Sequence, residues 1–87
     1  MLNNILTDKQ LIKIKKSKKK IVLCHGVFDL FHVGHLNHID DAKKFGDILI
    51  VSVTSDRYVN KGPGRPFFNL KQRMQILSSI KNIHYEL

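Results

Sequence analysis

The sequence has 87 residues, of which 43% are hydrophobic and 25% are charged, and its formal net charge is +8. These proportions are those of one soluble globular domain, so two independent folding units and global disorder are excluded. The longest apolar stretch, residues 48–53, is much shorter than the roughly 20 residues of a membrane-spanning helix. We therefore expect no membrane partner.

The positive charge is concentrated at the N-terminus. Residues 1–20 contain one acidic residue, Asp8, and seven lysines: Lys9, Lys13, Lys15, Lys16, Lys18, Lys19 and Lys20. Such a segment either binds nucleic acid or forms a solvated helix face. We favour the solvated face, because lysine, isoleucine and asparagine together make up 28 of the 87 residues, which indicates a general compositional bias. The single cysteine, Cys24, and the lack of a secretory signal pattern indicate a cytoplasmic protein.

The first element predicted along the chain is a helix. Thr7 and Gln10 have the spacing of a capping box, in which a hydroxyl and an amide each bond a backbone N–H group of the first turn. Residues 1–20 are therefore expected to form a basic leading helix.

A strand, a helix and a second strand follow. Residues 21–24 and 48–53 are continuous apolar runs rich in β-branched side chains, as in strands covered on both faces. Apolar residues recur every three positions from 33 to 45, which indicates an amphipathic helix with Gly46 at its C-cap. This βαβ unit implies two parallel strands.

The rest of the chain predicts a loop, a helix and a third strand. Residues 54–69 are rich in glycine, proline and asparagine and form the loop. Asn69 can cap a helix whose apolar face contains Leu70, Met74, Leu77 and Ile80, and residues 83–87 begin the strand. The predicted fold class is α/β, a Rossmann-like parallel sheet with flanking helices, truncated after the third strand.

We expect the functional residues in the segment that joins the first strand to its helix, His25-Gly-Val-Phe-Asp-Leu-Phe-His-Val-Gly-His35. Ligands of parallel α/β sheets bind at the carboxyl ends of the strands, beside helix N-termini. Gly26 allows close approach to a phosphate, and Gly34 keeps the first turn open between His32 and His35. Two imidazoles at this place can bind charge that develops on a phosphate.

This segment resembles the HxGH signature of the cytidylyltransferase-like nucleotidylyltransferase superfamily. The later segments 46–56 and 56–69 are similar to sugar-phosphate nucleotidylyltransferase modules related to ADP-heptose synthase and glycerol-3-phosphate cytidylyltransferase. The resemblance covers residues 21–87 and only the N-terminal part of such a domain. A second phosphate-binding motif of the family, Ser-Ser-Thr or Ser-Thr-Thr before an arginine, is absent, so transfer by this chain alone is expected to be weak.

The resemblance implies particular roles for eight residues. Its catalytic residues would be His32, His35 and Lys61, and its nucleotide-binding residues would be Gly26, Val27, Phe28, His32, His35, Lys61 and Arg73. Asp29 would be a substrate-binding residue that helps to order the acceptor. The implied reaction transfers CMP or AMP from CTP or ATP to a sugar or polyol phosphate with release of pyrophosphate, and Mg²⁺ accompanies the triphosphate.

The implied partners are these substrates, a second copy in a homodimer and a fused or separate sugar kinase. A homodimer or element swap is also expected because the edge beyond residues 83–87 would be unpaired. Other possible functions are a pantetheine-phosphate-type adenylyltransferase, a non-catalytic nucleotide-binding module and a nucleic-acid-binding module.

Several residues have simpler interpretations. Asp29 could cap its own loop, Arg73 could lie on the helix surface, and Lys61 and Arg65 could be solvated. Phe67 and Phe68 are expected in the core or as loop anchors, and His25 and His38 as structural neighbours. A zinc site from Cys24, His25, His32 and His35 is not favoured, because adjacent strand residues point to opposite faces.

Overall fold

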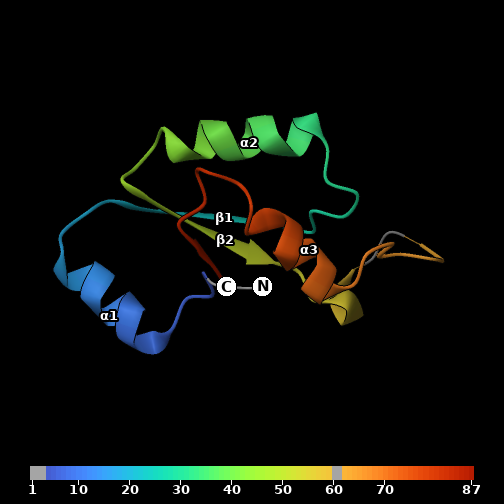
Figure 1. The fold of residues 1–87 in the computed structure, drawn as a ribbon, viewed down its shortest axis with the longest axis horizontal. Coiled ribbons are helices and arrows are strands. Elements are labelled where there is room, and N and C mark those ends of the chain that lie inside the picture. Colours follow the sequence, from blue (N-terminus) through green and yellow to red (C-terminus); the bar gives the residue numbers. More distant parts are fainter. Residues whose placement is uncertain (1–3, 60–61) are drawn as a thin grey trace.

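The protein is described by a computed structural model at residues 4–59 and 62–87, and its elements alternate as the sequence predicts (Figure 1). They are α1 (Asp8–Lys16), β1 (Ile21–Gly26), α2 (Val33–Lys43), β2 (Ile48–Val53), the 3-10 turn η1 (Asp56–Tyr58), α3 (Leu70–Leu77) and β3 (Tyr85–Glu86). The leading helix is shorter than the segment predicted for it, because it ends at Lys16 with Ser17 as its C-cap.

The strands form one parallel sheet in the order β1-β2-β3. Ile21 pairs with Ile48 at one end of the first ladder and Gly26 with Val53 at the other, so β1 and β2 end at the same edge. The predicted Rossmann-like α/β class, a parallel sheet with flanking helices, is confirmed. Across the described residues, no helix combines the length and the apolar character needed to span a membrane.

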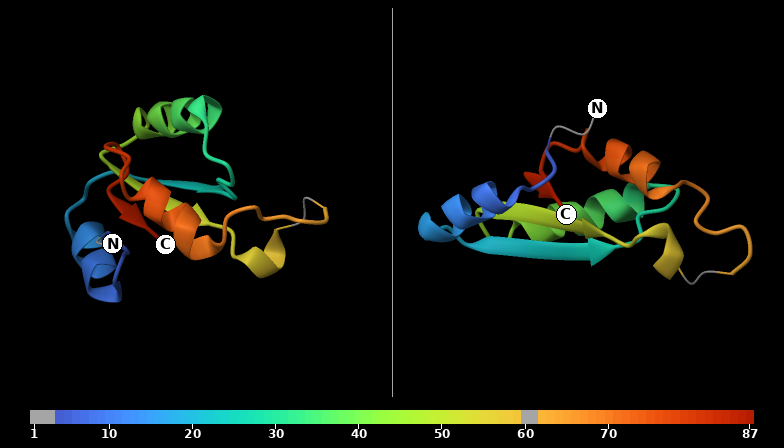
Figure 2. Two further views of the ribbon diagram at one scale, coloured as in Figure 1. Left: turned by 45° about the vertical axis from the view of Figure 1, so that its right-hand side comes forward. Right: turned by 90° about the horizontal axis from the view of Figure 1, so that it is seen from below.

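Helices α2 and α3 share one face of the sheet. Ile39 of α2 and Leu77 of α3 are fully buried in a cluster with Cys24, Leu49 and Val51 of the strands. Helix α1 lies on the opposite side (Figure 2). That second face is incompletely covered, because Leu23 of β1 is 60% exposed.

The capping predictions for α1 and α3 are confirmed, and the one for Gly46 is wrong. Thr7 with Gln10 and Asn69 with Gln72 form complete capping boxes. Helix α2 has Lys44 as its C-cap, two residues before Gly46. A Cβ at Gly46 would lie 2.6 Å from Val22 Cγ2 and 2.8 Å from the carbonyl oxygen of Lys20. Glycine is therefore needed here for close packing between the chain entering β2 and the start of β1.

The prediction of an unpaired edge at β3 is also wrong. Ile5 forms a parallel bridge with Glu86, in which Leu6 N donates to Glu86 O at 2.8 Å and Glu86 N donates to Asn4 O at 2.9 Å. The N-terminal segment thus occupies the outer side of β3. Among the described strands, the edge without a strand neighbour is that of β1.

The carboxyl group of Glu86 is buried without a hydrogen-bond partner among the described residues. Burial raises the pKa of Glu86 from 4.5 to about 7, because desolvation disfavours the charged form. The folded protein therefore keeps a proton that the unfolded chain releases between about pH 4.5 and 7, and the free energy of unfolding falls as the pH rises through this window.

Glu86→Gln should remove this pH dependence, because glutamine keeps the shape and stays neutral. In urea unfolding we expect the variant to match the wild type at low pH and to exceed it by about 1–3 kcal/mol above pH 7. Asp41→Asn, at an exposed ion pair with Lys44, is the matched control and should show no such gain. If the free energies of unfolding of E86Q and wild type differed by the same amount at about pH 4 and about pH 8, the raised pKa of Glu86 would be contradicted.

Candidate functional site

His32 and His35 cap the N-terminus of α2 together. His32 is the N-cap residue, and its Nδ1 accepts a hydrogen bond from Gly34 N at 3.0 Å. His35 Nδ1 accepts one from His32 N at 3.1 Å, so the two side chains form a capping box made of imidazoles. An accepting Nδ1 carries no proton, and in a neutral imidazole the proton is then on Nε2. If neutral, both rings therefore carry their proton on Nε2.

Aromatic contacts fix the orientation of the two imidazoles. The rings of His32 and His35 stack with centroids 4.0 Å apart. The ring of His35 also lies 5.7 Å from that of Phe28 in an edge arrangement and 5.3 Å from that of Phe31. His32 is exposed and His35 is half-buried. The pair can therefore present hydrogen-bond donors to an anion at the end of the helix dipole.

Gly34→Ala should disturb this pair without unfolding the protein. A Cβ at Gly34 would lie 2.8 Å from His32 Cε1 and 3.0 Å from its Nδ1. The His32 ring can rotate away, whereas the helix itself gains from alanine. We expect a melting temperature close to that of the wild type and a nucleotide affinity lower by about tenfold. A variant with unchanged affinity, measured by calorimetry with MgATP and MgCTP, would show that the His32 ring is not needed in this position.

The loop before α2 is held by Asp29, which is only 3% exposed. Phe28 and Leu30 on either side have φ values of 52° and 51°, a conformation that costs free energy in residues with a Cβ and is kept by surrounding contacts. The carboxylate of Asp29 supplies these contacts: it accepts hydrogen bonds from Leu30 N at 3.1 Å, Phe67 N at 2.6 Å and Phe68 N at 2.8 Å.

The Asp29 carboxylate is ionised in this setting. Burial alone would raise the pKa of Asp29, but the backbone hydrogen bonds from Phe68 and Phe67 and the charge of Arg65 lower it below the ordinary value. Through these hydrogen bonds, the carboxylate holds the loop before α2 and the loop before α3 together. These contacts agree with the interpretation of Asp29 as a loop cap. Its predicted role in ordering the acceptor stays a prediction.

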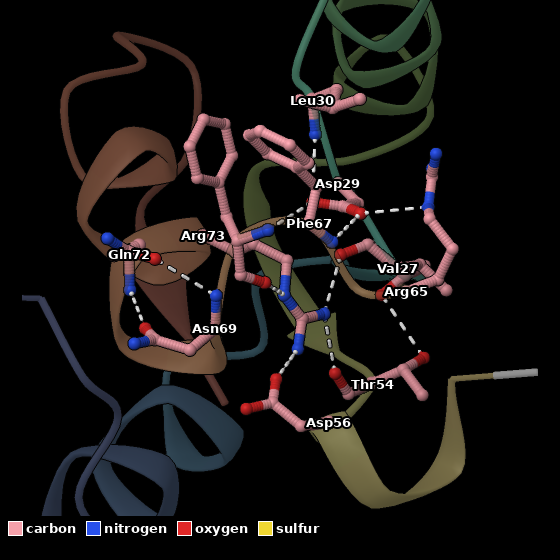
Figure 3. A network of polar contacts seen from close by, with 12 residues as sticks. Val27, Asp29, Leu30, Thr54, Asp56, Arg65, Phe67, Asn69, Gln72 and Arg73 are labelled. Carbon is pink, nitrogen blue, oxygen red and sulfur yellow. Dashed lines mark hydrogen bonds and ion pairs between the residues drawn. The ribbon is translucent and has the colours of Figure 1, made fainter. Parts of the chain in front are cut away.

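Arg73 of α3 joins three segments from a fully buried position (Figure 3). It donates from Nη1 to Val27 O at 2.9 Å and to Thr54 O at 2.6 Å, and from Nε to Phe68 O at 3.0 Å. Its Nη2 lies 2.6 Å from Asp56 Oδ1. The interpretation of Arg73 as a surface residue is wrong, because the side chain is fully buried and bonds these four acceptors. Its contact with a nucleotide stays a prediction.

The other predicted nucleotide contacts lie in or near the same loop. Gly26 ends β1, and its carbonyl oxygen accepts a hydrogen bond from Thr54 N at 2.9 Å. A Cβ at Gly26 would lie 2.9 Å from the ring of Phe28, which is buried. The glycine therefore makes room for an aromatic side chain in this structure, and a backbone contact with phosphate stays a prediction. Lys61 lies outside the described residues.

The neighbouring residues that were weighed for metal binding have other contacts. Cys24 is buried in the core, whereas His25 is exposed on the opposite face, as expected for adjacent strand residues. His25 bonds Ser52 Oγ through Nδ1 at 2.9 Å and Thr54 Oγ1 through Nε2 at 3.2 Å. His38 lies exposed on α2.

Sequence reasoning missed the residues that connect the loops. Thr54 and Asp56 were not singled out, although both follow the end of β2, where ligand sites of parallel sheets lie. Solvation was one alternative for Arg65, but its Nε lies 3.3 Å from Asp29 Oδ2. Phe68 is half-buried as a loop anchor and contacts Phe67, which is exposed, edge to face at 5.2 Å.

A parallel sheet whose first strand leads through an aspartate loop into an imidazole-capped helix defines an α/β domain of the nucleotide-binding type. A family model described as cytidylyltransferase-like matches residues 23–86. The chain belongs to this cytidylyltransferase-like family.

Two curated relatives and one solved structure illustrate the likeness. "Bifunctional protein HldE" of Desulfatibacillum aliphaticivorans is 38% identical over 74 residues, which are 83% of this chain and 15% of that protein. The protein of that name from Haemophilus influenzae (strain PittEE) is 41% identical over 73 residues, covering 82% of this chain and 15% of its own length. The chain thus spans about 15% of the curated relatives it matches.

The solved structure is the "lipopolysaccharide core biosynthesis protein from Thermoplasma volcanium GSS1". It superposes with a TM-score of 0.72 at 31% identity, over 78% of this chain and 56% of that one. Together, the family model and the superposition place this chain among cytidylyltransferase-like α/β domains.

Proposed function

We propose that this chain takes part in transfer of CMP or AMP from CTP or ATP to a phosphorylated sugar or polyol, with release of pyrophosphate. The observation that carries the proposal is the pair of imidazoles at the N-terminus of α2, both of which use Nδ1 within the helix cap, in a chain of this family. Hydrogen-bond donors fixed before the reaction are well suited to a phosphorus centre that gains charge.

In the proposed reaction, an acceptor phosphate oxygen attacks the α-phosphorus of the nucleoside triphosphate. The new P–O bond forms as the bond to the β-phosphate oxygen breaks, and pyrophosphate leaves with the electron pair of that bond. His32 and His35 donate from Nε2 to non-bridging oxygens of the α-phosphate, and Lys61 neutralises the phosphate tail. The protein forms no covalent intermediate, so positioning and electrostatics lower the barrier.

Mg²⁺ enters this proposal with the triphosphate, as part of the substrate. Mg²⁺ at nucleotide sites is usually held by phosphates with few protein ligands. Within residues 4–59 and 62–87 there is no group of three or more histidine, cysteine or acidic side chains that could hold a metal ion. The nearby carboxylates of Asp29 and Asp56 are paired with Arg65 and Arg73. The chain's contribution therefore comes from its cationic and N–H donors.

The proposal leaves open whether the nucleotide is CTP or ATP and which phosphate is the acceptor. It includes a cytoplasmic location and a fused or separate sugar kinase.

The proposal also includes a homodimer. Among the described strands, the edge without a strand neighbour is that of β1, whose Leu23 is 60% exposed, so we place the proposed interface there. Sedimentation equilibrium tests this point, and a monomer at all concentrations would remove the dimer from the proposal.

Pyrophosphate release tests the proposed function directly. The chain is incubated with MgATP or MgCTP and a panel of sugar 1-phosphates, glycerol 3-phosphate and phosphopantetheine, and pyrophosphate is measured by a coupled assay. Release that depends on a sugar or polyol phosphate supports the proposal. Release only with phosphopantetheine would assign the other acceptor class. Nucleotide binding with no release, even at protein concentrations and times that detect weak transfer, would identify a non-catalytic module.

Lys61→Ala should weaken binding of triphosphates more than binding of monophosphates. A lysine in this loop acts as a point charge on the β- and γ-phosphates, which AMP and CMP lack. We expect calorimetry to show an affinity for MgATP or MgCTP lower by about tenfold, with a change of less than about twofold for the monophosphates. Equal losses for both kinds of ligand would assign Lys61 to the general surface charge.

A further inference from the structure

We propose that Arg65 binds a substrate phosphate, with its guanidinium held beside the histidine site by the buried carboxylate of Asp29. This inference rests on the proposed function and adds a cationic residue to it. The pair joins the loop before α2 to the loop before α3, and Asp29 precedes His32 by three positions.

The contact anchors only the Nε side of the guanidinium. Arg65 Nε lies 3.3 Å from Asp29 Oδ2, and this nitrogen is buried without a hydrogen bond. The side chain of Asp29 is completely buried, whereas that of Arg65 is 32% exposed. Since Nε is buried, the exposed surface lies elsewhere on the side chain. Figure 3 shows the guanidinium of Arg65 extending past Asp29, beside the ribbon that leads into α2.

Asp29 has other donors besides Arg65. Three backbone N–H groups, those of Leu30, Phe67 and Phe68, already donate to its two oxygens. Arg73 is the contrasting case, since its guanidinium is fully buried and donates to three carbonyl oxygens and a carboxylate. Of these two arginines, Arg73 therefore serves the fold and Arg65 is the one that can serve a ligand.

The chemistry of the exposed end favours a phosphate. The two Nη groups of arginine match two oxygens of one phosphate in a bidentate contact, which a lysine cannot reproduce. The same phosphate would lie near the N-terminus of α2, where the helix dipole and the imidazole donors also favour an anion. The ligand class is thus a terminal phosphate, either that of the acceptor or that of the triphosphate tail.

Binding measurements on the full chain test the proposal and separate the two sources. The probes are inorganic phosphate, glucose 1-phosphate, AMP and MgATP. Arg65→Gln and Arg65→Lys are compared with Arg57→Gln, which removes a positive charge at an exposed arginine in η1. Arg65→Lys keeps a cation for Asp29, so a folded variant is available even if Arg65→Gln is unstable.

We expect both Arg65 variants to bind at least one phosphate probe about tenfold more weakly, and Arg57→Gln to change binding by less than about twofold. If the affinity for inorganic phosphate and glucose 1-phosphate falls, Arg65 binds the phosphate of the acceptor. If the affinity for MgATP falls more than that for AMP, Arg65 binds the triphosphate tail. Unchanged affinities in a folded Arg65→Lys, or an equal loss in Arg57→Gln, would overturn this inference alone. A wild-type chain that binds none of the probes would overturn it together with the proposed function.

Discussion

Replacing Arg73 with methionine should lower the free energy of unfolding by about 3–5 kcal/mol, a large part of the stability of a domain this small. The substitution keeps the aliphatic volume but removes all the donors of a side chain with no exposed surface. The carbonyl oxygens of Val27, Thr54 and Phe68 would lose their partner. Buried acceptors without donors carry most of the cost.

Urea unfolding of Arg73→Met, Arg73→Lys and Lys71→Met measures this effect. Lysine should not restore stability, because one ammonium group cannot reach acceptors on three separate segments. Lys71→Met alters an exposed residue of the same helix and should change the free energy by less than about 0.5 kcal/mol. A loss below about 1 kcal/mol for Arg73→Met would mean that the network does not hold the loops together.

His32→Asn and His35→Gln should each lower the rate of pyrophosphate release by about 10²-fold or more, because each removes one donor to the developing charge. The replacements are chosen to keep the helix cap. Asparagine can accept from Gly34 N as His32 does, and glutamine can accept from the backbone N–H of residue 32 as His35 does.

The rate is measured with the acceptor that gives release in the wild type. His38→Ala, at an exposed position on the same helix, is the control and should keep the wild-type rate. Circular dichroism should show unchanged helix content in all the variants. Rates near that of the wild type in both His32→Asn and His35→Gln would remove the imidazoles from the mechanism.

The elements of the fold could be predicted because their signals are local. The apolar runs in β1 and β2, the periodicity of α2 and the capping residues Thr7 and Asn69 each lie within one segment. The bridge between Ile5 and Glu86 could not be predicted, since its partners lie at opposite ends of the chain and the segment around Ile5 has no strand pattern. The error at the sheet edge follows from this missing pair.

The candidate site was predicted in part for the same reason. The two histidines belong to one short motif, so their position at the N-terminus of a helix could be predicted from the sequence. Asp29 contacts Phe67 and Phe68, which follow it in the sequence by 38 and 39 positions. Arg73 contacts Val27, which precedes it by 46 positions. A charged residue on a short helix usually faces water, so burial of Arg73 depends on acceptors that only the folded loops bring together.

The central claim is that the imidazoles of His32 and His35 hold the nucleotide phosphates through Nε2–H. Nitrogen-15 NMR of the histidine rings during titration with MgATP and MgCTP tests it most directly. We predict that the free chain has both rings in the Nε2–H tautomer and that one nucleotide shifts both Nε2 signals while His38 and His84 stay unchanged. Unchanged Nε2 signals of His32 and His35 in a folded chain would contradict the claim.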